Sequence, residues 1–346
     1  MGMKAIQFAD GVRQLYIPKL NTVSEWSTTG LRGWLADTDN FVPNQTGQSD
    51  HVELALYDVT ESLVSWAGDI ARLACASLET VKGITQTPGS KKFLAWQLVE
   101  YYYSAFYAAH CTLKICNFGL IQLDNRIINN IKRRANTLGT IVPNTFCKGI
   151  YCANIQPTLS KIILYKVQRY DDSHRGLWQR YADFLNVLSG ISIVTGTVDS
   201  NCVRKRNSAE GHPQSIYSQM PLLDAQLLIE RIDEVKRILN NTGDFNWLSS
   251  IRNAINYNHS FGIWYPYKAF RNEYEKLLEM NNLHLQNPLD PIFNLTDEVD
   301  LSQFVKCCQL INSINRELII DLSSRHPESK SFLNRGPLKY IKLQRT

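Results

Sequence analysis

The chain has 346 residues, of which 44% are hydrophobic and 20% are charged, and its formal net charge is +5. This composition excludes an intrinsically disordered chain and provides a core for two domains or for one large domain with insertions. Eight cysteines without a C-x-x-C pair exclude a zinc ribbon and a thioredoxin-type motif. With no signal peptide in the N-terminal sequence, we expect a cytoplasmic protein with reduced thiols.

The first 57 residues are predicted to form an N-terminal cap whose fold the sequence leaves open. Short alternating runs at 5–8 and 12–17 predict a small β element, and the stretch from 37 to 50 has the Pro and Gly of a loop. Residues 1–50 have the weakest helical pattern of the chain.

A helical core is predicted for residues 58–280. Apolar residues at steps of three and four begin near residue 58, and a second long helix follows from about 91 to 117. The most apolar stretch, 93–121, contains Gln97, Glu100, His110 and Lys114. These polar groups would be costly in hydrocarbon, so we expect a buried helix and no contact with a membrane.

A basic insertion is predicted within this core, at residues 125–215. It holds thirteen Lys and Arg and five Asp and Glu, a net charge of +8, which leaves −3 for the rest of the chain. Its two basic clusters are candidate RNA-binding residues, because clustered cations follow a phosphate backbone, and a solvated surface is the alternative. These residues are Lys132, Arg133, Arg134, Arg204, Lys205 and Arg206.

Helical patterns resume after the insertion. Helices are expected at 177–188 within the basic segment, and then at 222–239, 246–261, 267–280 and 300–322. Residues 281–346 are predicted to be a C-terminal helical extension. The pair Cys307–Cys308 lies inside the last of these patterns, which favours a core position over a redox role.

The most informative polar pattern lies in the predicted helix at 246–261. Arg252, Asn256 and His259 are separated by four and three residues, which places them on one helical face, with Arg252 and His259 about 10 Å apart along the axis. Arginine can bind a phosphate and its developing charge, and histidine can transfer a proton near neutral pH. The alternative is a polar helix face with a solvated arginine and a hydrogen-bonded histidine.

Two segments together resemble the HEPN-domain superfamily. The stretch from Val99 to His110, VEYYYSAFYAAH, resembles the YYxAFxAA first core helix of these proteins. Arg252 and Asn253, followed by His259, resemble the R-x(4–6)-H motif of their last core helix. Both occur in the expected order, and they cover about ten residues each.

This resemblance implies a helical bundle that dimerises and joins two R-x(6)-H stripes into one ribonuclease site. It implies that Arg252 binds the scissile phosphate, that His259 acts as acid or base, and that Asn253 or Asn256 orients them. It also implies cleavage without a metal, through attack of the ribose 2′-hydroxyl. In some family toxins a tyrosine follows the histidine by two residues and is modified by a partner nucleotidyltransferase; here Phe261 occupies that position, which argues against such a partner.

The sequence therefore predicts a mainly α protein: a HEPN-like bundle with a large basic insertion and a small β element at the N-terminus. The predicted function is that of a homodimeric, metal-independent endoribonuclease, a regulated toxin or antiphage defence effector with an antitoxin or sensor partner. No metal or cofactor is expected. The first alternative is a non-catalytic HEPN-fold module that binds RNA or a protein, and the second is a helical scaffold. Asp171, Asp172 and His174 could form a metal site or a triad fragment, but a turn beside a helix start is the favoured interpretation.

Overall fold

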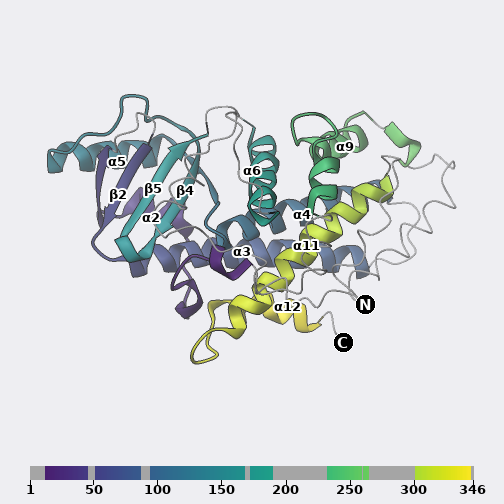
Figure 1. The fold of residues 1–346 in the computed structure, drawn as a ribbon, viewed down its shortest axis with the longest axis horizontal. Helices are drawn as coiled ribbons and strands as arrows, with labels where there is room; N and C mark the ends of the chain where they lie inside the picture. The colour runs from purple at the N-terminus through teal and green to yellow at the C-terminus, as the bar shows by residue number, and fades with distance from the viewer. Residues whose placement is uncertain are drawn as a thin grey trace.

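The computed structural model describes residues 12–45, 51–86, 94–167, 172–189, 232–258, 260–264 and 301–343. A β-sheet lies at one end of the molecule, and long helices extend away from it (Figure 1). The candidate site lies in the helical part.

The sheet has five antiparallel strands in the order β1-β2-β5-β4-β3. The strands are β1 (Phe41–Gln45), β2 (His51–Leu56), β3 (Leu120–Leu123), β4 (Gly149–Gln156) and β5 (Lys161–Lys166). Strands β4 and β5 form a hairpin that turns at Pro157–Leu159 and at Ser160, whose φ of 46° lies in the left-handed region. Strands β4 and β5 are buried along almost their whole length, so both faces of the sheet are covered there.

The helical part is built around α4 (Leu94–Ile115). The other helices are α2 (Gly30–Asp37), α3 (Val59–Gln86), α5 (Asn125–Leu138), α6 (Ser173–Leu188), α9 (Trp247–Asn256), α11 (Leu301–Ser324) and α12 (Pro337–Leu343), with short 3-10 turns at Arg13–Leu15, Leu20–Thr22, Ser260–Gly262 and Phe332–Arg335. Helix α4 packs against α3, α6, α9 and α11. Because it is covered on several sides, α4 is apolar around most of its circumference and its alanines are fully buried.

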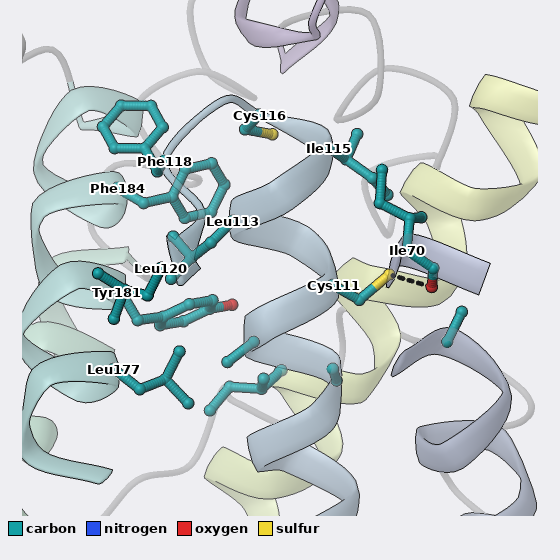
Figure 2. Packing of buried hydrophobic residues seen from close by; sticks show 14 of the residues in the cluster. Ile70, Cys111, Leu113, Ile115, Cys116, Phe118, Leu120, Leu177, Tyr181 and Phe184 are labelled. Carbon is teal, nitrogen blue, oxygen red and sulfur yellow. Dashed lines mark hydrogen bonds between the residues drawn. The ribbon is translucent and has the colours of Figure 1, made fainter. Parts of the chain in front are cut away.

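The centre of the core lies between α4 and its neighbours. Figure 2 shows Leu113 of α4 facing Tyr181 and Phe184 of α6, while Cys111 lies on the other side, toward Ile70 of α3. The Cys111 thiol lies 3.6 Å from the Ile70 carbonyl oxygen. Burial raises the pKa of this thiol far above its ordinary value. None of the seven cysteines in the described residues is in a disulfide, and Cys307 and Cys308 are buried, as expected from the pattern of α11.

The prediction of a mainly α bundle is wrong. Within the described residues the fold is a helix-rich α/β structure, in which two central strands of the sheet come from the segment predicted to be a basic insertion. The runs Ile150–Ile155 and Ile162–Tyr165 are short, rich in apolar residues and bounded by turn-forming residues. Such runs are typical of strands buried on both faces, which have no alternating pattern, and the segment's overall charge and turn residues obscured them.

The expected N-terminal β element also differs from the structure. Residues 13–15 of the predicted 12–17 strand form a 3-10 turn. The strands of this region are β1, which lies within the predicted loop at 37–50, and β2, which follows that loop. The predicted run at 5–8 lies outside the described residues. Strand β2 pairs with β5, so the N-terminal segment and the basic segment share one sheet.

Candidate functional site

Helix α9 brings Arg252 against the helix that carries the YYY sequence. The Arg252 side chain is only 7% exposed. Its guanidinium carbon lies 5.0 Å from the centre of the Tyr102 ring and 5.8 Å from that of Tyr103. The two segments that carry the HEPN resemblance are therefore in direct contact, although 150 residues separate Tyr102 from Arg252.

A hydrogen-bond network surrounds the Tyr102 hydroxyl. This oxygen lies 2.7 Å from Nδ1 of His174 and 2.8 Å from Oγ of Ser249. The indole Nε1 of Trp178 donates to the Tyr102 oxygen at 3.2 Å and to the Ser249 oxygen at 3.1 Å. We call Tyr102, His174, Trp178, Ser249 and Arg252 the Tyr102 cluster; it joins α4, α6 and α9.

The charge of Arg252 has no counter-ion in the part of the chain that the structure describes. No carboxylate there lies within ion-pair distance of its guanidinium, and its Nε is buried without a hydrogen-bond partner. A buried charge is strongly destabilising unless it is paired, and the face of an aromatic ring compensates only part of that cost. The site is therefore electrostatically suited to an anion.

The same environment shifts the pKa values of the neighbouring groups. Burial raises the pKa of the Tyr102 hydroxyl, against the opposing effects of Ser249, Trp178 and Arg252. Burial, together with the Arg252 charge, lowers the pKa of His174, against the weaker effect of Asp172. At neutral pH the cluster thus holds a neutral tyrosine, a neutral imidazole and one cation.

Aromatic rings line the side of the cluster toward the C-terminal half of α4. The Phe106 ring lies 4.5 Å from the His174 ring and 4.8 Å from the His110 ring, measured between centroids. Burial, the charge of Lys114 and the neighbouring imidazole of His174 lower the pKa of His110 to about 3, against the opposing effect of Asp69.

The low pKa of His110 predicts that acid destabilises the fold. The folded-state pKa lies below the unfolded value of about 6.5, so the stabilisation is complete above that pH and is lost as the pH falls toward 3, by about 3 kcal/mol between pH 6.5 and pH 4. Urea unfolding of the wild type and of His110→Phe at pH 6.5 and pH 4 measures this loss. The wild type should lose more stability than the variant, and an equal loss in both would contradict the prediction.

The predicted asparagines and histidine of the R-x(6)-H segment are not all on the Arg252 face. Asn253 is exposed and Asn256 is partly buried. Helix α9 ends at Asn256, so the assumption of one continuous helical face through residue 259 does not hold. His259 itself lies outside the described residues.

The predicted RNA-binding residues of the first basic cluster lie on α5, where two of them contact the link before β1. Arg133 donates to the Asp39 carboxylate at 2.8 Å. Arg134 donates to the backbone oxygens of Asp39, at 2.6 Å, and of Phe41, at 3.3 Å. Lys132 is partly buried. Arg204, Lys205 and Arg206 lie outside the described residues.

Tyr102 and Ser249 were not predicted to belong to a site, and His174 was a candidate only as part of a metal or triad fragment. Asp172 caps the start of α6, where its carboxylate accepts from the His174 amide at 2.9 Å, in agreement with the expected turn beside a helix start. The side chain of His174, however, points to Tyr102. Ser249, three residues before Arg252, was the one available signal, because that spacing places both on one helical face.

The described residues contain no group of three or more His, Cys, Asp or Glu that is suited to a metal, and no helix among them has the length and apolarity needed to cross a membrane. No family model, curated protein or solved structure matches the chain. The HEPN resemblance therefore rests on the residues themselves.

Proposed function

We propose that the protein is a metal-independent endoribonuclease, a regulated toxin or antiphage defence effector, that acts at the Arg252 site. The observation that supports this proposal is the buried guanidinium of Arg252, which lies on the Tyr102 ring without an acidic partner in the described residues. A phosphodiester supplies the anion that such a cation lacks, and binding there would neutralise it.

In the proposed reaction the ribose 2′-oxygen attacks the adjacent phosphorus as the bond from phosphorus to the 5′-oxygen breaks. The products are a 2′,3′-cyclic phosphate and a 5′-hydroxyl. Arg252 stabilises the charge on the phosphoryl oxygens, and His259 transfers a proton. The proposed partners are RNA, a second copy of the chain across a two-fold axis, and an antitoxin or sensor that restrains the enzyme.

The test is cleavage of a labelled single-stranded RNA by the wild type and by His259→Ala, with and without EDTA. We expect cleavage that persists in EDTA, that ends when the ribose at the cut site is replaced by 2′-deoxyribose, and that falls by about 10²–10⁴-fold in His259→Ala. Full activity of His259→Ala, or activity that EDTA removes and magnesium restores, would contradict the mechanism.

The burial of Arg252 also favours a second candidate, a module that binds RNA or a protein without cleaving it. Arg252 is 7% exposed, and so small an accessible surface suits a partner that stays bound better than a substrate that must enter and leave at each turnover. Arg252-dependent retention of RNA, without cleavage by any preparation of the wild type, would select this candidate.

A further inference from the structure

His174 has the arrangement of a general base that is held in place by its neighbours. Its Nδ1 lies 2.7 Å from the Tyr102 hydroxyl. The His174 side chain is partly exposed, and its Nε2 makes no hydrogen bond within the described residues. An imidazole with one nitrogen anchored and the other accessible is the form that acid–base catalysis requires.

We propose that His174 is the general base of the Arg252 site and that Tyr102 is its positioning residue. This inference rests on the proposed ribonuclease function. In the step, Nε2 of His174 takes the proton of the attacking 2′-hydroxyl as the 2′-oxygen bonds to phosphorus. The leaving 5′-oxygen takes a proton from the general acid, a role that the proposed function then leaves to His259, and solvent restores both groups.

The hydrogen bonds around Tyr102 are compatible with the tautomer of His174 that a general base requires, in which Nδ1 carries the proton and Nε2 does not. The Trp178 indole is only a donor, so it occupies one lone pair of the Tyr102 oxygen. If the Tyr102 hydroxyl donates to Ser249, its second lone pair can accept a hydrogen bond from Nδ1–H of His174, in competition with the Arg252 guanidinium. Nε2 then carries the lone pair, and the anchoring hydrogen bond persists after the imidazole is protonated.

The groups around His174 keep it neutral until a phosphate binds. Arg252 faces it from α9, His110 lies near it on α4, and Asp172 precedes it at the start of α6. Arg252 opposes protonation of the imidazole, and a phosphate bound to Arg252 removes that opposition. Substrate binding should therefore strengthen the base, because it raises the pKa of His174.

One more ion pair lies beside His174. Arg175 pairs with Asp244 on the segment before α9. The Asp244 carboxylate largely compensates the charge of Arg175. Arg252 has no such carboxylate in the described residues, so the Arg252 charge is the one that a bound anion neutralises.

The first test compares cleavage by His174→Ala, His174→Gln and the wild type across pH. Both variants should lose about 10²–10⁴-fold in kcat/KM and lose the acidic limb of the pH profile. Added imidazole should restore part of the activity of His174→Ala and none of that of Arg252→Ala, a difference that a purely structural role of His174 would not produce. Tyr102→Phe should show a smaller loss, mainly in kcat, and thermal melting shows whether each variant is folded.

The second test needs no cleavage. The imidazole C–H resonances of the wild type are followed by NMR across pH with and without inorganic phosphate, and His174→Gln identifies the signal. The pKa of His174 should rise on addition of phosphate and in Arg252→Gln. An unchanged pKa in both cases overturns the inferred coupling between the two residues.

The outcomes separate this inference from the proposed function. A wild type that cleaves RNA together with a fully active, folded His174→Ala overturns the inference alone. A wild type that cleaves no RNA overturns the proposed function and this inference with it.

Discussion

Replacing Arg252 with alanine is expected to reduce RNA cleavage by at least about 10²–10³-fold, because the charge that develops on the phosphoryl oxygens loses its cation. Single-turnover cleavage of the labelled RNA, measured over a range of enzyme concentrations, separates this loss from weaker binding. Arg126→Ala is the matched control, since it removes the same charge from a side chain that is 70% exposed on α5. This control should retain the wild-type rate.

A companion variant distinguishes a functional arginine from a structural one. Arg252→Met replaces the buried cation with an apolar side chain that also packs against Tyr102. If the charge is present for an anion, this variant should be inactive, with a free energy of unfolding equal to that of the wild type or up to about 2 kcal/mol higher. A large loss of stability would instead assign the Arg252–Tyr102 contact to the fold. A wild-type cleavage rate in either variant would contradict the proposed site.

Replacing Asp183 with alanine is expected to destabilise the protein by about 3–5 kcal/mol, because a buried cation would lose its carboxylate. Arg180 and Asp183 both lie on α6, where Nη1 of Arg180 is 3.2 Å from Oδ2 of Asp183. Their side chains are 6% and 4% exposed. Arg180 also donates to the Tyr165 hydroxyl at 3.0 Å and contacts the Cys152 thiol at 2.9 Å, which ties α6 to β5 and β4.

Urea unfolding measures this effect, and Glu234→Ala provides the control. Glu234 and Arg237 form a pair with the same three-residue spacing, but their side chains are 33% and 55% exposed, so the loss there should be below about 0.5 kcal/mol. Equal losses in the two variants would show that the Arg180–Asp183 pair is not effectively buried. Because α6 carries His174, the Asp183 variant should also lose cleavage activity at temperatures where it is still largely folded.

The long helices α3, α4 and α11 were predictable because each has a local pattern, whereas α2 and α5 were not predicted. Residues Phe304, Cys307 and Ile311 repeat at steps of three and four, and they lie on the buried side of α11. Helix α4 was predicted from the apolar stretch that also contains Tyr102. In both cases the hydrophobic face is set by residues within one or two turns of each other, which a single sequence displays directly.

The sheet was not predictable in the same way. Strand β2 pairs with β5, which follows it by about a hundred residues, and the register places Leu54 opposite Ile162. Nothing local in either segment specifies the other, and a strand buried on both faces has no alternating pattern to identify it. The mainly α prediction failed for this reason.

Local sequence patterns are enough to predict the long helices α3, α4 and α11, the buried positions of Cys307 and Cys308, and the placement of Arg252 on a helix. The contacts of Arg252 depend instead on how the helices pack. The packing of α9 and α6 on α4 places Arg252 and His174 against Tyr102, although the three residues lie far apart along the chain. A hydrogen bond or an aromatic contact acts over a few ångströms, so it depends on which helices pack together, and that is decided by the whole core.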